Sequence, residues 1–533
     1  MKISYIVITA IGALALYAQL PAAAAAPVNR GAARASYIVQ GPGFAVTARA
    51  VKDAGGEITH ELRIINAVAA TLTSRQHVQL QADRRLTLTA NGSASVAGTS
   101  APYAVRYTQA DMLHAMGITG KGVSIAFVDT GLWATPLAGY DAINNIVTTN
   151  VPDGNGHGTH ITSIAASANI MPDGKYLGLA PGASWVAVKA FGADGTGSYA
   201  NVIRGLDWIL ANAKTYNIRV VNMSFGAAPQ SFYWNDPLAK AVMKLWQAGI
   251  VAVVSAGNGG PTAQSITVPG NVPYVITVGA MSDNFTPANP LDDHLASFSS
   301  TGPTYEGFVK PEVLAPGGHI TGVMTKNQTI ARAHIEFHDS GNYFTMSGTS
   351  QAAAVTSGVV ALMLQAQPFL TPDQVKCKLM SSARPAVDGS GKLAYTVFQQ
   401  GAGQINAIDA VFNQNYGCAN LGLHIAADIA GTQHFMGPAR QDTAGNFYVV
   451  DASGSQVNQQ GYLWNNGYLW NQGYLWNNGY LWNQGYLWNQ GYLWNNGYLW
   501  NNGYLWNNGY LWNQSTLAPA SAPAAMESWN VQE

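Results

Sequence analysis

Residues 101–417 alternate short, almost uninterrupted apolar runs with longer segments of helical pattern, and this alternation limits the fold more than any other feature. Strands that are apolar at every position are buried on both faces, and intervening helices cover them. The pattern predicts an α/β fold, a mostly parallel buried sheet with helices on both faces. The predicted strands are Val123–Val128, Trp185–Phe191, Arg219–Met223, Ile250–Val254 and Tyr274–Val278, and the predicted helices are Ala200–Lys214, Leu238–Ala248, Gln351–Gln367 and Pro372–Ser382.

Polar residues stand where several of these elements end or begin. Asp129 directly follows the first predicted strand, and Asn258 comes shortly after the fourth. His157 and Ser350 each open an apolar helix. Because ligands of open parallel sheets bind beyond the carboxyl ends of the strands, we expect these side chains to meet at one edge of the sheet.

The chemistry of an acyl transfer needs these residue types. A serine hydroxyl such as that of Ser350 is a weak nucleophile without a base, and the imidazole of His157 has a pKa suited to that role. The carboxylate of Asp129 would fix the tautomer of His157 and stabilise the imidazolium. The oxyanion needs preplaced donors, which the side chain of Asn258 and the backbone N–H of Ser350 offer.

Four motifs occur in an order that resembles the subtilisin-like serine proteases, or subtilases. They are Val-Asp-Thr-Gly131, Gly156-His-Gly-Thr-His160, Ser255-Ala-Gly-Asn258 and Ser347-Gly-Thr-Ser350, and supporting stretches include Gly178-Leu-Ala-Pro-Gly182 and Asn222-Met-Ser-Phe-Gly226. The resemblance covers roughly residues 36–415. It implies a serine endopeptidase in which Asp129, His157 and Ser350 are catalytic and Asn258 binds the oxyanion.

The sequence departs from the family pattern in two places. The family usually follows its serine with Met-Ala-x-Pro, but here Gln351-Ala-Ala-Ala354 follows, so an oxidisable thioether is missing and we expect better tolerance to peroxide. The family's calcium loop is not recognisable. We therefore assign no metal site and no cofactor, and the sequence leaves a calcium site elsewhere in the chain open. His160 is read as a packed histidine, because no third ligand motif follows.

The resemblance places a polypeptide substrate in a groove, where its backbone pairs as an added strand. The expected edges are Gly195-Thr196-Gly197 and Ser224-Phe225-Gly226. The first pocket is expected to involve Ser224–Ala227, Ser255–Asn258 and Thr267. None of these residues carries a charge, which favours a neutral or apolar residue before the cut.

The N-terminal region resembles a signal peptide followed by an inhibitory propeptide. Residues 1–26 have a basic start, an apolar stretch and a small-residue cleavage zone. Residues 36–90 form the expected small α+β propeptide, and residues 91–100 have the composition of a linker. The resemblance implies that the propeptide caps the groove, and we expect Ser350 itself to cleave the chain within 90–103.

Beyond the catalytic domain, predicted as 101–417, lie an unassigned extension (418–460), a repeat and a tail (515–533). The repeat holds nine copies of Gly-Tyr-Leu-Trp-Asn-(Asn/Gln) over residues 461–514. Its even period would place Tyr and Trp on one face of a strand. It could contact a cell surface or polysaccharide through exposed rings, or be a tail removed after export, or pack on itself without a ligand, and the sequence does not choose between these.

Composition excludes some classes of function and leaves others open. The net charge of −1, without basic runs, argues against binding to nucleic acid. No segment after the signal is long and apolar enough for a membrane span. The two cysteines, Cys377 and Cys418, could form a disulfide in an oxidising compartment or remain buried thiols.

The sequence therefore predicts a secreted serine endopeptidase, extracellular or in the cell envelope, that matures by autocleavage. Its expected partners are polypeptide substrates and its own propeptide. The alternative is an envelope-binding adhesion protein that uses the aromatic repeat and carries a vestigial protease domain.

Overall fold

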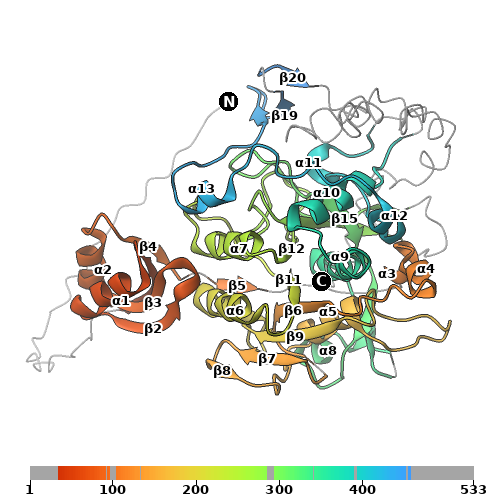
Figure 1. The fold of residues 1–533 in the computed structure, drawn as a ribbon, viewed down its shortest axis with the longest axis horizontal. Helices are drawn as coiled ribbons and strands as arrows, with labels where there is room; N and C mark the ends of the chain where they lie inside the picture. The colour runs from red at the N-terminus through yellow and green to blue at the C-terminus, as the bar shows by residue number, and fades with distance from the viewer. Residues whose placement is uncertain are drawn as a thin grey trace, which may run out of the picture.

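The computed structural model describes residues 34–91, 93–95, 104–132, 134–284, 293–339, 341–388, 393–451 and 454–457. The predicted signal peptide, most of the linker, the repeat and the tail lie outside these residues, and so do the readings proposed for the repeat. Apart from the short linker strand at 93–95, the described chain has three parts, which we call the N-terminal unit (34–91), the central unit (104–417) and the C-terminal arm (418–457) (Figure 1).

The central unit is built on a nine-stranded sheet, as the apolar runs predict. Its strand order is β14-β13-β12-β11-β6-β9-β7-β8, with β15 paired to β13. All pairings are parallel except those of β14 and β8, which are antiparallel. The strands are β6 (Ser124–Asp129), β7 (Ala138–Asp141), β8 (Ile146–Val147), β9 (Ser184–Lys189), β11 (Ile218–Met223), β12 (Val251–Ser255), β13 (Ile276–Ser282), β14 (His294–Leu295) and β15 (Val313–Pro316).

Helices cover both faces of this sheet, so the predicted α/β class is confirmed. Helices α5 (His157–Ala166) and α9 (Thr349–Ala366) pack against each other and one face, whereas α6 (Tyr199–Asn212) and α7 (Pro237–Gln247) pack together on the other (Figure 1). The remaining helices of the unit are α3 (Ala104–Tyr107), α4 (Ala110–Ala115), α8 (Thr329–Ala333), α10 (Pro372–Ser382), α11 (Val397–Gln400) and α12 (Ala407–Phe412); a hairpin pairs β16 (Ile320–Val323) with β17 (Tyr343–Met346).

The last predicted strand is the one whose start differs most from the structure. β13 begins at Ile276, not at Tyr274. Two buried lysines donate hydrogen bonds to the backbone carbonyls just before β13. Lys376 Nζ donates to Tyr274 O, and Lys310 Nζ donates to Val275 O. The strand therefore starts only where the carbonyls are free for a neighbouring strand.

The N-terminal unit is a small α+β structure. Its antiparallel sheet has the order β2-β3-β1-β4, formed by β1 (Arg34–Gln40), β2 (Glu57–Leu62), β3 (Ala67–Thr73) and β4 (Thr87–Ala90). Helices α1 (Phe44–Asp53) and α2 (Ser74–Gln81) complete it, and α2 starts with a capping box between Thr73 and Gln76. The unit lies beside α6 of the central unit (Figure 1).

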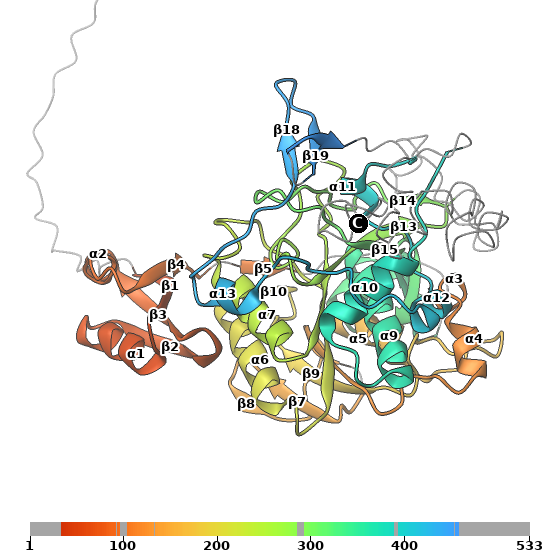
Figure 2. The same ribbon diagram turned by 45° about the horizontal axis from the view of Figure 1, so that its top comes forward.

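The C-terminal arm, for which the sequence suggested no structure, runs back over the central unit. Its short helix α13 (Ile425–Ile429) lies against α7, and a hairpin-like sheet of β18 (Ala439–Gln441), β19 (Phe447–Val450) and β20 (Gln456–Val457) follows (Figure 2). The buried carboxylate of Asp428 accepts hydrogen bonds from Tyr233 and Tyr274 of the central unit at 2.6 and 3.0 Å and contacts His434 Nδ1 at 2.7 Å. These bonds fix the middle of the arm.

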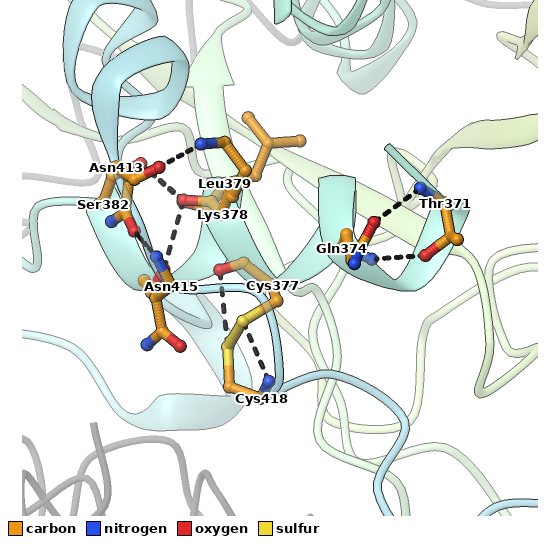
Figure 3. Close-up of a disulfide and its surroundings, with 10 residues drawn as sticks. Thr371, Gln374, Cys377, Lys378, Leu379, Ser382, Asn413, Asn415 and Cys418 are labelled. Atoms are coloured by element: carbon orange, nitrogen blue, oxygen red, sulfur yellow. Dashed lines mark hydrogen bonds between the residues drawn. A yellow bond between two sulfur atoms is a disulfide. The ribbon is translucent and has the colours of Figure 1, made fainter. Parts of the chain in front are cut away.

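The arm begins at a disulfide. Cys418 is bonded to Cys377 of α10, with the two Cα atoms 5.1 Å apart (Figure 3). Of the two states that the sequence left open, the structure has the disulfide. Helix α10 itself starts with a capping box, in which Gln374 N donates to the Thr371 hydroxyl and Thr371 N donates to the Gln374 side chain.

The arm and the central unit line an open cavity of about 420 Å³. Lys310, Glu312 and Lys376 line it, and both lysines contact Glu312 Oε1, at 2.6 and 2.8 Å. Burial lowers the pKa of Lys310 to about 7. Because these residues precede β13 and β15 or contact their starts, the cavity lies at the amino-terminal edge of the parallel sheet, opposite the edge where the sequence places the active site. Among the described helices, none combines the length and hydropathy needed to cross a membrane.

Candidate active site

Three separate elements position the predicted catalytic residues. Asp129 ends β6, His157 is the first residue of α5, and Ser350 is the second residue of α9. All three are buried, with exposed fractions of 1%, 0% and 3%. Residues that are 221 positions apart in sequence are thus held in one core, because α5 and α9 pack against each other and against β6.

The structure pairs His157 with Asp129. Nδ1 of His157 lies 2.8 and 3.0 Å from the two carboxylate oxygens of Asp129. An ionised carboxylate only accepts hydrogen bonds, so Nδ1 carries the proton and Nε2 of the neutral ring is an acceptor. Nε2 is buried and has no hydrogen-bond partner among the described residues. The imidazole is therefore oriented with a free base nitrogen.

Glycine in the His-Gly-Thr-His motif permits this close pairing. A Cβ atom on Gly158 would lie 2.3 Å from Gly131 O and 3.1 Å from the Asp129 side chain, so a larger residue would push α5 away from β6. Thr130 joins the same two elements, because its hydroxyl accepts from Gly158 N at 2.9 Å and its backbone N donates to Asp129 Oδ1 at 2.8 Å.

Asp153, which sequence reasoning missed, organises the start of α5. Its Oδ1 accepts from the backbone N of Asn155 and Gly156, and its Oδ2 accepts from the backbone N and the hydroxyl of Thr159, at 2.7–3.0 Å. An acidic residue four positions before a predicted helix start is the signal that could have found it. The carboxylate also complements the positive end of the helix dipole beneath His157.

Ser350 does not hydrogen-bond to His157 in this structure. Its Oγ donates to the backbone O of Ser224 at 3.0 Å. The two helix starts are nevertheless adjacent, because Gln351 Nε2 lies 3.4 Å from Nδ1 of His160. Hydrogen bonds of a catalytic serine are often long or poorly aligned before substrate binds, so the missing bond does not argue against the predicted role of Ser350.

Asn258 lies beside Ser350, the predicted nucleophile, and among the described residues its amide nitrogen has no hydrogen-bond partner. Its Oδ1 accepts from the backbone N and the hydroxyl of Thr349, at 3.0 and 2.8 Å. Asn258 is exposed, so the NH₂ group is turned away from these bonds and can reach a ligand. Thr349 belongs to the Ser347-Gly-Thr-Ser350 motif, but the sequence assigned it no role; its hydroxyl also accepts from Gly257 N at 3.1 Å.

His160 is a packed histidine, as expected. It is fully buried, its Nε2 bonds to Phe344 O at 3.0 Å, and its Nδ1 faces Gln351. Burial lowers its pKa to about 3, so it stays neutral. Both ring nitrogens are engaged, which leaves none for a metal. In the described part of the chain, no group of three or more His, Cys, Asp or Glu side chains is arranged to hold a metal ion.

The first predicted substrate edge already carries a strand. β10 (Thr196–Ser198) pairs antiparallel with β5 (Ser93–Ser95), and Gly197 lies opposite Ala94. A Cβ atom on Gly197 would lie 2.6 Å from Ala190 O, so the edge needs glycine at this position. The linker after the N-terminal unit thus occupies the edge in the manner of an added strand.

The second predicted edge has one residue that faces away from a substrate. The side chain of Phe225 is buried against Phe191, with ring centroids 5.0 Å apart, so only its backbone is available. Gly226 touches Thr267, which the sequence placed in the first pocket; a Cβ on Gly226 would be 2.3 Å from its hydroxyl oxygen. Ser224 contacts Ser350 directly.

A family model described as the subtilase family matches residues 120–409, which is more than half of the chain. The chain belongs to the subtilase family. Family membership makes it a serine endopeptidase with a subtilisin-like fold.

Several relatives of this subtilase are themselves proteases. It is 40% identical over 312 residues to serine protease AprX of Bacillus subtilis, an overlap of 56% of this chain and 68% of that protein. It is 31% identical over 311 residues to subtilisin DY of Bacillus licheniformis, over 57% of this chain and 96% of that protein. The crystal structure of fervidolysin, a keratinolytic enzyme from Fervidobacterium pennivorans, matches 72% of this chain and 62% of that chain with a TM-score of 0.55 and 23% identity, which shows the fold alone.

Proposed function

We propose that this subtilase is a secreted endopeptidase that cleaves peptide bonds through Asp129, His157 and Ser350, with Asn258 as oxyanion donor. The observation that carries the proposal is the imidazole of His157, protonated at Nδ1 by its pairing with Asp129 and unpartnered at the buried Nε2. A general base needs this arrangement, a fixed tautomer with the acceptor nitrogen aimed at the site.

The reaction would proceed as two acyl transfers. Ser350 Oγ leaves Ser224 O, gives its proton to His157 Nε2 and attacks the substrate carbonyl carbon. The resulting oxyanion accepts hydrogen bonds from Asn258 Nδ2 and the backbone N–H of Ser350, while Asp129 stabilises the imidazolium. His157 then protonates the leaving amine as the C–N bond breaks. Water attacks the acyl-enzyme by the same route in reverse and releases the acid.

A substrate would enter as a strand between the two edges. The pairing of β5 with β10 supports this mode, because it shows that the edge at Thr196 and Gly197 accepts an antiparallel backbone. The edge at Ser224 and Gly226 would take the other side of the substrate. The uncharged surroundings at Thr267 favour a neutral or apolar residue before the cut.

The N-terminal unit would act as an inhibitory propeptide. It is joined to α6 by His60 Nε2 against Asn201 Oδ1 at 2.6 Å and by Arg204, which donates to Thr59 O at 3.0 Å. Asn91 Oδ1 accepts from Ala200 N at 3.0 Å, in the first turn of α6. Residues 93–95 then pair with β10, so the linker would occupy this edge of the groove in the uncleaved chain. Cleavage would fall after β5 and before α3, within 96–103, inside the window that the sequence predicts.

Mass spectrometry of the secreted protein tests the whole proposal. The parent should start within 96–104 and lack the propeptide, whereas Ser350→Ala should retain residues 36–95 when made without other proteases. The half-buried Ser231, whose hydroxyl bonds among the described residues only to the neighbouring Phe232 O, is a matched control, so Ser231→Ala should mature like the parent. A Ser350→Ala chain that matures and hydrolyses casein at the parental rate would refute the assignment of the nucleophile.

A further inference from the structure

A buried hydrogen-bond chain connects the body of α9 to its own catalytic start through β11. Asn222, near the carboxyl end of β11, has a side chain with an exposed fraction of 0%. Ser357 Oγ donates to Asn222 Oδ1 at 2.9 Å, and Asn222 Nδ2 donates to Ser224 Oγ at 2.9 Å. Ser224 Oγ in turn donates to Ser350 O at 2.8 Å. Every hydroxyl of this chain is buried.

The hydrogen bonds of this series all run in one direction, from Ser357 through Asn222 and Ser224 to Ser350. Because Asn222 donates to Ser224 Oγ, the hydroxyl of Ser224 must turn its own proton toward Ser350 O. In this orientation both amide atoms of Asn222 have a partner, because the oxygen accepts from Ser357 and the nitrogen donates to Ser224. The backbone of Ser350 is thereby tied to Ser224, whose backbone O is also the acceptor for Ser350 Oγ at 3.0 Å. Two bonds that fix the nucleophile therefore depend on the position of Ser224.

We propose that Asn222 is a positioning residue: through Ser224 it holds Ser350 at the distance and angle that acylation needs. Asn222 itself touches neither substrate nor the reacting atoms. The inference rests on the proposed role of Ser350 and adds to it a residue that acts through another. In an active site, a displacement of about 1 Å can lower a rate about 100-fold. Loss of the Asn222 hydrogen bonds should therefore lower the rate of acylation more than it lowers the stability of the fold.

Two variants with a matched control test the proposal in the full chain. Asn222→Ala removes both of its bonds, and Ser357→Ala removes only the bond that orients the amide. Thr356→Val is the control, because the neighbouring buried Thr356 hydroxyl donates to Ala352 O within α9 and not to β11. The readout is the second-order rate at which a small phosphonylating reagent, which needs no substrate groove, labels Ser350, with the unfolding temperature of each variant measured alongside.

We expect Asn222→Ala to lower the labelling rate by about tenfold or more, equivalent to about 1.4 kcal/mol. Ser357→Ala should lower the rate by about threefold, and Thr356→Val should change it by less than about twofold, at temperatures well below unfolding. A purely structural role would lower the unfolding temperatures of all three variants while leaving labelling per folded molecule unchanged, and that result would overturn the proposal. If the parent is not labelled at Ser350 at all, the proposed function fails instead, and the two failures are distinct.

Discussion

Removal of the disulfide should release the start of the C-terminal arm and destabilise the protein measurably. Cys377 and Cys418 are separated by 41 residues. In the chain-entropy model, a bond that closes a loop of this length lowers the entropy of the unfolded chain by an amount worth about 4 kcal/mol at 25 °C. Because Cys418 is 2% exposed and its backbone N donates to Cys377 Sγ, replacement by alanine adds a small packing loss to this figure.

The expected effect can be converted to a melting temperature. The entropy of unfolding is about 2.1 cal/mol/K per residue, and the central unit and arm comprise about 350 residues, so about 4 kcal/mol corresponds to a decrease of about 5 °C. The variant is Cys377→Ala with Cys418→Ala in a Ser350→Ala background, which prevents self-digestion. Thermal unfolding is followed by tryptophan fluorescence.

A reductant provides the control for this experiment. It should lower the melting temperature of the disulfide-containing protein toward that of the double variant and leave the double variant unchanged. If the double variant melts within about 1 °C of its parent, the loop-closure reasoning is wrong, because the loss of a 41-residue constraint is too large to escape detection.

Three further predictions concern the site and the propeptide. Asn258→Leu should lower kcat by about 10²–10³-fold with little change in KM, a magnitude taken from the side-chain oxyanion donor of subtilisin and checked by steady-state kinetics on a peptide substrate. The enzyme should keep its activity in peroxide, whereas Gln351→Met should lose activity at a rate measurable by timed assays, because a thioether then lies beside Ser350. Burial and the nearby charge of Arg204 lower the pKa of His60 to about 4. Because an unperturbed imidazole titrates near 6.5, inhibition by the separate propeptide should be complete above that pH and weaken as pH falls toward 4; inhibition constants at pH 8, 6 and 5 test this, and in His60→Gln the dependence should largely vanish.

The sequence is sufficient to predict the sheet, its covering helices and the residues at its edge. Fully apolar runs such as Val123–Val128 identify buried parallel strands, and the residue at the end of such a run has a defined place in space. For this reason Asp129 and His157 could be paired before any coordinates were known. The four motifs further reduced the number of candidate site residues, because each motif stands at a strand end or a helix start.

Other features could not be predicted because they depend on contacts between segments far apart in the chain. Nothing local marks Asp428 as the partner of two tyrosines that precede it by more than 150 residues. The start of β13 is set by Lys310 and Lys376, which approach from other segments. The direction of a hydroxyl, such as the bond from Ser350 to Ser224, is decided by neighbours at atomic distance and leaves no periodic pattern.

The close packing of α5 and α9 explains how such weakly patterned helices can bring the predicted catalytic residues together. Nearly all residues of α9 are buried, so it shows no polar face from which its position could be read. Gly358 of α9 faces Ala165 of α5 and the side chain of Leu179. A Cβ atom on Gly358 would lie 2.4 Å from the Leu179 side chain and 3.0 Å from Ala165 O. Small residues let the two helix axes approach, and the approach brings the start of α9 to the start of α5. The contact at Gly358 lies about two helical turns from Ser350 along α9 and about two turns from His157 along α5. The small size of this glycine therefore helps to set the distance between Ser350 and His157.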